Sequence, residues 1–203
     1  MSEPKNETIH SEPSDNATTG CLFIISAPSG AGKTTLCNAI LKKFPDLCYS
    51  ISHTTREPRT DEQDGVDYFF ITQEKFKNNI EKGSWAEWAQ VHGHFYGTSA
   101  QFIDRHLSEG KNILLDIDVN GAKQILYRYP HSITIFIMPP TFETLKQRLI
   151  KRGTDSEQVI IKRLINAETE IAQKDLYKHI VVNDSLPEAI KTLSAIISDN
   201  QPR

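Results

Sequence analysis

A glycine-rich segment from Ala27 to Thr34 is the first part of this sequence whose spacing suggests chemistry. It reads A-P-S-G-A-G-K-T and lies between an apolar run and a stretch with helical spacing. Gly30 and Gly32 let the backbone turn its N–H groups inward, and the start of a helix adds a positive dipole, so this loop could enclose phosphate oxygens. Lys33 could reach the outer phosphates as a point charge, and the Thr34 hydroxyl is placed to bind Mg²⁺.

One residue departs from the strict phosphate-loop motif. Ala27 stands where the motif has its first glycine, and alanine has a steric cost wherever the backbone needs a positive φ. The alternative interpretation is an ordinary glycine-rich turn between a strand and a helix. The intact G-x-G-K-T-T and both flanking elements favour phosphate binding.

Two carboxylates end the apolar segment Asn112–Asp118, which predicts a strand. Asp116 and Asp118 are two residues apart, so in a strand both would point to the same face. The carboxyl ends of strands are where open α/β sheets bind ligands. These groups could orient Mg²⁺ through water or accept hydrogen bonds from a substrate; alternatively, each caps the turn at Asn120-Gly121.

Two arginines in the first third of the chain form a first basic pair. Arg56 and Arg59 lie in a polar, proline-containing loop after Ser50. The planar guanidinium suits phosphate, and two arginines three residues apart could bind one monophosphate together. The alternative is a pair of solvated surface arginines.

A second basic group lies on a predicted helix, break and helix. Arg148 and Arg152 are four residues apart and share a helix face, Gly153 breaks the helix, and Arg163 follows on the second segment. Thr154 is expected to cap that second segment, in a capping box with Glu157 three residues later. This pattern is typical of a lid that closes over a transferring phosphoryl group, and the alternative is a solvated helical hairpin.

Composition limits the class of protein. The chain has 203 residues with a net charge of −3, so it lacks the basic excess that is typical of nucleic-acid or membrane-surface binding. Its three cysteines form no C-x-x-C pair, which favours reduced thiols and a cytoplasmic location. No apolar run reaches membrane-spanning length. We expect residues 1–19 to be a disordered tail because they are polar and rich in Ser, Pro, Asn, Glu and Thr.

Apolar runs and helical spacings alternate along most of the chain. The expected strands are 21–26, 68–71, 85–91, 112–118, 132–138 and 179–182. The expected helices are 33–44, 73–82, 100–109, 121–129 and 187–198, with a helical region 141–175 that breaks at Arg152-Gly153. The alternation predicts an α/β fold of the P-loop NTPase type, with a parallel sheet, helices on both faces, an inserted smaller mixed lobe and a helical lid.

Seven short segments stand in a fixed order along the chain. They are S-A-P-S-G-A-G-K-T-T, S-x-T-T-R-x-P-R, W-x-E-W-A, Y-G-T-S, L-D-I-D-x-x-G-A, R-G-T-D-S-E and V-N-D. Through them the sequence from about Cys21 to Ile197 resembles the guanylate kinase family, whose members also commonly carry alanine at the position of Ala27. The resemblance implies Mg²⁺-dependent transfer of the γ-phosphoryl group of ATP to GMP, giving ADP and GDP in purine nucleotide metabolism.

The resemblance also implies roles for individual residues. The implied ATP-binding residues are Ala27, Pro28, Ser29, Gly30, Ala31, Gly32, Lys33, Thr34, Thr35 and Asn183. The implied GMP-binding residues are Ser52, Arg56, Arg59, Tyr68, Glu87, Tyr96, Thr98 and Asp118. The implied catalytic residues are Lys33, Arg59, Arg148, Arg152 and Arg163. Thr34 would bind Mg²⁺ directly, and Asp116 could do so through water.

The implied recognition of guanine has a simple chemical reason. A carboxylate at Glu87 can accept hydrogen bonds from guanine N1–H and the 2-amino group together. Adenine offers an acceptor at N1 and has no 2-amino group, so it would leave a buried charge unpaired. Family members often have serine where Thr98 stands, so the hydroxyl is kept and a methyl group is added.

The resemblance implies one guanylate kinase-like domain over residues 20–203. Its core would comprise 20–50, 100–140 and 168–203, with a GMP-binding lobe over about 51–99 and a lid over about 141–167. The expected partners are ATP and GMP, without nucleic acid or membrane, and a homo-oligomer is left open.

Two other interpretations compete with the kinase. A guanylate-kinase-like binding module would use this fold as a scaffold for protein partners, but such domains typically lose the phosphate loop or the GMP-binding residues. Lys33, Thr34, Arg56, Arg59 and Glu87 are all present here. A P-loop kinase for another phosphate acceptor is the second alternative, and Glu87 with Thr98 argues against it.

Overall fold

The computed structural model of the chain describes residues 19–91, 93–153 and 155–201. The expected tail over residues 1–19 therefore lies outside the described residues, apart from Thr19. None of the helices in the described part of the chain is long and apolar enough to cross a membrane.

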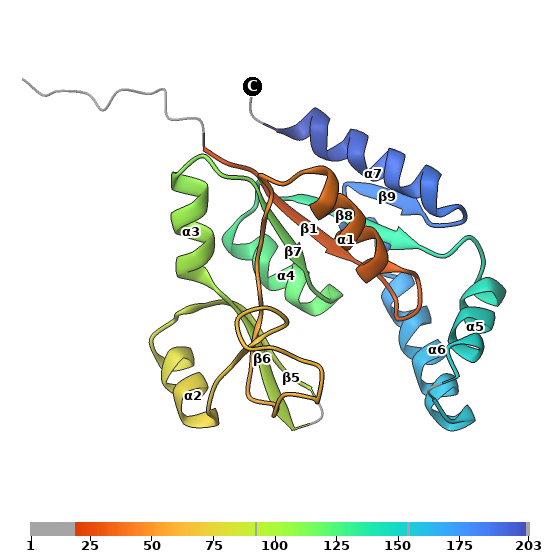
Figure 1. Cartoon of the computed structure of the whole chain (residues 1–203), viewed down its shortest axis with the longest axis horizontal. Helices are drawn as coiled ribbons and strands as arrows, with labels where there is room; N and C mark the ends of the chain where they lie inside the picture. Colours follow the sequence, from red (N-terminus) through yellow and green to blue (C-terminus); the bar gives the residue numbers. More distant parts are fainter. Residues whose placement is uncertain (1–18, 92, 154, 202–203) are drawn as a thin grey trace, which may run out of the picture.

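A parallel sheet of five strands forms the centre of the molecule (Figure 1). The strands are, in spatial order, β2 (Cys48–Tyr49), β7 (Ile113–Asp116), β1 (Leu22–Ser26), β8 (Ile133–Met138) and β9 (His179–Val182). All neighbouring pairs are parallel, with Leu22 opposite Ile113 and Phe23 opposite Ile133. The predicted parallel sheet is confirmed.

Both faces of this sheet are covered by helices because both sets of alternating β1 side chains are apolar. Phe23 and Ile25 pack in one cluster with α1 (Lys33–Lys43) and α7 (Leu186–Asn200). Leu22 and Ile24, which point the other way, pack in a second cluster with α3 (Ala100–Ser108) and α4 (Val119–Arg128). Burial of β1 on two sides explains its unbroken apolar sequence.

A second, smaller lobe contains a mixed sheet. Its strands, in spatial order, are β4 (Phe69–Phe70), β3 (His53–Thr54), β6 (His94–Ser99) and β5 (Trp85–Val91), and one helix, α2 (Gln73–Glu81), packs on them. Phe76, Trp85 and Phe95 form a separate hydrophobic cluster in this lobe. The lobe therefore has its own core, and its chain leaves the main sheet after β2 and returns at α3 (Figure 1).

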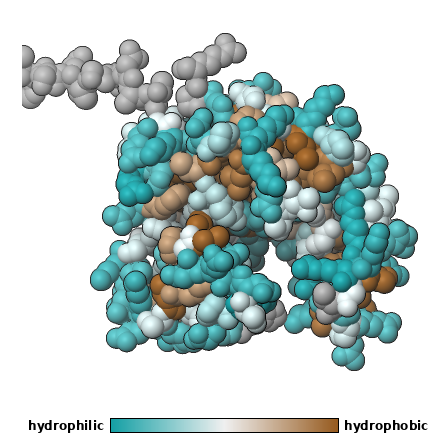
Figure 2. Space-filling model, in the orientation of Figure 1, coloured by the Kyte–Doolittle hydropathy of each residue, from teal (hydrophilic) through white to brown (hydrophobic). Residues whose placement is uncertain are grey.

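Two helices between β8 and β9 project away from the sheet. They are α5 (Phe142–Lys151) and α6 (Glu157–Ile171), followed by the short 3₁₀ helix η1 (Lys174–Leu176). Leu145, Leu149 and Ala167 join the two helices in a small apolar cluster. Figure 2 shows the molecule hollowed between this α5–α6 pair and the smaller lobe.

Two local expectations differ from the structure. Strand β7 ends at Asp116, and α4 begins already at Val119, because the Asp118 side chain accepts a hydrogen bond from the Gly121 N–H and caps the helix. The cap of α6 is Ser156, whose hydroxyl accepts from the Val159 N–H, so the expectation of a cap at Thr154 is wrong. Thr154 itself lies outside the described residues.

Candidate active site

The phosphate loop follows β1 and leads directly into α1. Gly30 and Gly32 have φ angles of +90° and +95°, which only glycine adopts without strain. Gly32 is also the N-cap of α1, and within the described residues no side chain caps this helix end. The first N–H groups of α1 are therefore left for an anion, as a phosphate loop requires.

Ala27 has a structural explanation. Its side chain is buried and belongs to the same hydrophobic cluster as Phe23 and Leu36. The methyl group thus packs beneath the loop instead of interfering with it.

Lys33 and Asp116 meet where β1 and β7 end side by side. The Lys33 ammonium forms an ion pair with the Asp116 carboxylate and also approaches the Ile117 carbonyl at 3.5 Å. Both line a cavity of about 260 Å³ together with Thr34. A hydroxyl and a carboxylate in one cavity are oxygen donors of the kind that Mg²⁺ prefers, and Mg²⁺ usually takes few ligands from protein.

A cavity of about 340 Å³ extends from Lys33 and Asp116 into the smaller lobe. Five residues of the predicted GMP-binding set line it: Ser52, Tyr68, Glu87, Tyr96 and Asp118. A sixth, Thr98, is buried beside Glu87. The structure thus brings together residues from β5, β6, two loops and the cap of α4.

Glu87 is a buried carboxylate with one direct partner. Glu87 is only 7% exposed, and the Thr98 hydroxyl donates a hydrogen bond to its Oε1 at 2.6 Å. Burial raises the pKa of Glu87 to about 7, against which the Thr98 hydrogen bond acts, while the nearby charge of Asp118 raises it further. Among the described residues no cation contacts this carboxylate, so it is suited to hydrogen-bond donors that a ligand brings.

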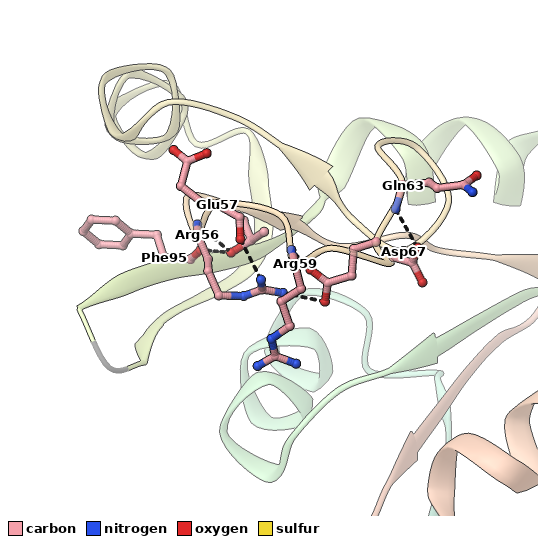
Figure 3. Close-up of polar contacts among 8 residues, drawn as sticks. Arg56, Glu57, Arg59, Gln63, Asp67 and Phe95 are labelled. Atoms are coloured by element: carbon pink, nitrogen blue, oxygen red, sulfur yellow. Dashed lines mark hydrogen bonds and ion pairs between the residues drawn. The ribbon is translucent and has the colours of Figure 1, made fainter.

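Arg56 and Arg59 have different environments (Figure 3). Arg56 donates to the Glu62 carboxylate at 2.8 Å and to the Glu57 carbonyl at 2.7 Å, and its guanidinium lies 5.6 Å from the centre of the Tyr68 ring. The pKa of Arg56 is raised above its usual value, mainly by the hydrogen bond to Glu62. The Arg59 side chain is exposed, while its backbone N–H donates to the other Glu62 oxygen at 2.8 Å.

Glu62 is a residue that the sequence interpretation missed. It holds the side chain of one arginine and the backbone of the other, and so fixes the loop between them. The signal that could have indicated it is a carboxylate three residues after Arg59 in the loop that carries both arginines.

A cleft of about 610 Å³ lies between the phosphate loop and the α5–α6 pair. The predicted ATP-binding and lid residues that line it are Ala27, Pro28, Ser29, Gly30, Gly32, Lys33, Thr34, Thr35, Arg148 and Arg152. Arg163 reaches the same loop, since its guanidinium donates to the Ser29 hydroxyl at 3.0 Å and also pairs with Asp155 at 3.4 Å.

Asn183 connects the loop to the first of these helices. The Asn183 side-chain amide donates to the backbone carbonyl of Ala31 at 2.8 Å. The backbone carbonyl of Asn183 accepts from the Arg148 guanidinium, also at 2.8 Å. A side chain at Gly32 would collide with this amide, which gives that glycine a second reason besides its φ angle.

Glu170 is a second residue that the sequence interpretation missed. It lies half-buried on α6 and lines the cleft with Arg148 and Arg152. Burial raises its pKa, helped by the charge of Asp118 and opposed by Lys33. Glu170 is seven residues after Arg163, two helical turns on the same face, and that spacing could have indicated it.

The matches to known proteins agree with this geometry. The guanylate kinase family model matches residues 20–200. The chain belongs to the guanylate kinase family. Guanylate kinase from Thermotoga maritima is 42% identical over 91% of this chain and 89% of its own length. Guanylate kinase from Geobacter metallireducens is 46% identical over 88% of both chains.

A solved structure gives the same result. The crystal structure of guanylate kinase from Anaplasma phagocytophilum superposes with a TM-score of 0.74 at 30% identity, covering 92% of this chain and 88% of that one. These relatives confirm the resemblance drawn from the sequence and the prediction of a guanylate kinase, a nucleotide-binding phosphotransferase of the nucleoside monophosphate kinase class.

Proposed function

We propose that this guanylate kinase transfers the γ-phosphoryl group of ATP to GMP with Mg²⁺, giving ADP and GDP, and so recycles GMP in purine metabolism. The observation that carries the proposal is the buried Glu87–Thr98 pair in a cavity that also contains Lys33 of the phosphate loop. A base recognised by Glu87 would have its phosphate directed toward the transferring group of a nucleotide bound at that loop.

The base of GMP would be recognised by Glu87. Ionised Glu87 can accept from guanine N1–H and the 2-amino group, and the Thr98 hydroxyl holds one of its oxygens in place. Adenine would leave the buried carboxylate without donors, which is costly. Asp118, the N-cap residue of α4, is close enough to raise the pKa of Glu87 and would add a second hydrogen-bond acceptor near the base.

The GMP phosphate would be bound at the other end of the same cavity. Ser52, Tyr68 and Tyr96 offer hydroxyl groups there, and Arg56 lies against the Tyr68 ring. Glu62 keeps Arg56 in this position while leaving part of its five-donor guanidinium for an anion. Arg59 is exposed on the same loop and would complete the site when the lobe closes.

The ATP phosphates would lie in the phosphate loop. Lys33 would exchange its Asp116 partner for phosphate oxygens, and Arg148, Arg152 and Arg163 would neutralise the charge that spreads over the transferring group. The GMP phosphate is already an anionic nucleophile, so its attack requires no general base. Asn183 would lie toward the adenine side.

Mg²⁺ would be held by the Thr34 hydroxyl, with Asp116 acting through water. Bound there, the ion would supply positive charge to the phosphates of ATP. The residues fit this role because both oxygen donors share a cavity with Lys33.

The proposal divides the chain into three working parts. The core, 20–50, 100–140 and 168–203, carries the phosphate loop; residues 51–99 bind GMP; residues 141–167 are a lid. Closing of both outer parts over the nucleotides would exclude water from the transfer. Free thiols at Cys21, Cys37 and Cys48 favour a reducing, cytoplasmic location.

The test is ADP production from ATP and Mg²⁺ with GMP, AMP, CMP or UMP as the only acceptor. We expect turnover with strong preference for GMP. Preference for another nucleotide would assign the chain to a different acceptor. No turnover with any acceptor, from folded protein, would instead favour the binding-module interpretation.

A further inference from the structure

Strand β5, which carries Glu87, is an edge strand with an irregular start. In its pairing with β6, Trp85 lies opposite Ser99 and Glu87 opposite Thr98, so Ala86 is an extra residue and forms a β-bulge. The bulge lets three successive residues be buried in different places. Trp85 belongs to the core of the smaller lobe, Ala86 to the cluster beneath the main sheet, and Glu87 to the GMP-side cavity. A bulge of this kind redirects a side chain.

At Trp88, the residue after Glu87, the free edge of β5 is occupied by a side chain from α4. Gln124 of α4 accepts from the Trp88 N–H at 3.2 Å through Oε1 and donates from Nε2 to the Trp88 carbonyl at 3.0 Å. The carboxamide thereby satisfies both backbone groups of Trp88, as a neighbouring strand would. Both bonds cross from α4 to the smaller lobe, directly after Glu87 in the chain.

The same face of α4 shapes the other side of Glu87. Asp118, Gly121 and Gln124 follow one another at intervals of three residues, so they lie along one side of the helix start. A Cβ atom at Gly121 would be 2.9 Å from Oε2 of Glu87, so glycine makes room for the carboxylate. Along the chain, Glu87 therefore lies between the bulge at Ala86 and the residue that Gln124 binds, Trp88.

We propose that Gln124 is a positioning residue for guanine selectivity: its two hydrogen bonds to Trp88 fix the β5 backbone against α4 and so set the place of the Glu87 carboxylate. The inference rests on the proposed role of Glu87 in base recognition. Hydrogen-bond recognition depends steeply on position, and an edge strand without a neighbour has more freedom to twist and shift. Gln124 itself does not touch the base.

The test compares Gln124→Met with the unmodified enzyme. Methionine has nearly the same length and volume but cannot form either bond to Trp88, so packing of α4 against β5 is kept. Lys123→Ala, an exposed neighbour on the same helix, is the matched control. For each protein, kcat and KM are measured for GMP, AMP, IMP and ATP, and Gln124→Ala is a second variant should methionine prevent folding.

We expect KM for GMP to rise about tenfold in Gln124→Met, with a similar fall in the GMP/AMP ratio of kcat/KM. The KM for ATP and the kcat at saturating GMP should change less than about twofold, because the phosphate loop is untouched. The kcat/KM for IMP, which lacks the 2-amino group, should fall less than the kcat/KM for GMP. Lys123→Ala should behave as the unmodified enzyme.

Three results would overturn the inference. An unchanged GMP/AMP ratio in both Gln124 variants, while Glu87→Gln lowers it, would show that Gln124 has no part in selectivity and would leave the proposed function intact. Equal rises in KM for ATP and GMP would indicate general damage instead of positioning. An unmodified enzyme without preference for GMP would contradict the proposed function and, with it, this inference.

Discussion

At the scale of single residues, Glu87 combines burial with a ligand-directed role. Its carboxylate is held by Thr98 but has no cation among its described contacts, so the unliganded enzyme keeps it at a cost. That cost appears as a pKa of about 7. A buried carboxylate without a cation is stabilised most by a ligand that brings two N–H donors, which leads to two predictions for Glu87.

Replacement of Glu87 by Gln should weaken discrimination between GMP and AMP. The amide has nearly the same shape, but it removes the negative charge and turns one acceptor into a donor facing guanine N–H groups. We expect the GMP/AMP ratio of kcat/KM to fall by about a hundredfold, mostly through GMP. Steady-state kinetics with both acceptors checks this, and an unchanged ratio would sink the assignment of Glu87.

The same residue should make stability depend on pH. The folded enzyme holds the Glu87 proton up to about pH 7, whereas the unfolded chain releases it near its ordinary pKa of 4.5. The folded state therefore binds more protons within this window, and the free energy of unfolding falls as pH rises through it, on the order of a few kcal/mol.

Urea unfolding at about pH 5 and about pH 8 measures this effect in the unmodified enzyme and in Glu87→Gln. The variant should lose the part of the slope that belongs to Glu87. If the two proteins show the same pH dependence, the raised pKa of Glu87 is contradicted.

At the scale of elements, the α5–α6 pair depends on few apolar contacts. Leu149 is buried between these helices, and a Cβ atom at Gly30 would meet its side chain at 2.9 Å. Leu149→Ala should loosen the pair where it meets the phosphate loop, at a local cost of about 2–5 kcal/mol. Because the main sheet keeps its own clusters, the loss should fall on ATP binding more than on global unfolding.

Equilibrium binding measures this separation. We expect Leu149→Ala to weaken binding of a non-hydrolysable ATP analogue by about tenfold while binding of GMP alone stays within about twofold. Leu193→Ala, which opens a cavity under α7 at a residue that does not line the cleft, is the control and should lower global stability instead. An equal loss of both ligands would refute a local role for the pair.

Elements with a clear apolar pattern could be predicted, and contacts between elements distant in the sequence could not. The continuous apolar run of β1 and the glycine spacing after it predict the strand, the loop and the helix nearly to the residue. Strands β2 and β3, which were not predicted, have two residues each, too few to show a period; β4 lies within the expected strand 68–71. The contact of Gln124 with Trp88 depends on how α4 meets β5, which neither spacing nor composition contains, whereas Glu62 lies only three residues from Arg59.

The site was predicted best where chemistry depends on one segment. The predicted loop residues other than Ala31 line one cleft, and their role in ATP binding stays a prediction. Asp118 was expected to extend a strand beside Asp116, but the helix N-terminus needed a cap and took its carboxylate. Asp118 thus caps α4, as the alternative interpretation expected, and it also lines the cavity with Glu87; its role toward a ligand stays a prediction.

At the scale of the whole molecule, the two cavities proposed to bind the nucleotides share a lining residue. Lys33 lines both the cleft beside the α5–α6 pair and the cavity that reaches Glu87. A ligand with adenosine and guanosine joined by a chain of phosphates should span them, and it should bind at least about a hundredfold more tightly than either nucleotide alone.

Calorimetric titration checks this prediction. The control ligand carries adenosine at both ends of the same phosphate chain. Its affinity should exceed that of ATP only slightly, because the second adenosine cannot donate two hydrogen bonds to the Glu87 carboxylate. Equal affinity of the two ligands would mean that the cavities do not act as one continuous site.

The insertion of the smaller lobe has a consequence for how the chain folds. Cys48 of β2 pairs with Ile113 of β7, so the main sheet can close on that side only after a long intervening segment has been drawn together. Closing such a loop is slow when the loop is a random coil. The lobe's own cluster of Phe76, Trp85 and Phe95 can collapse first and shorten it. We therefore expect Phe76→Leu to slow refolding of the entire enzyme, and stopped-flow kinetics would reveal the delay.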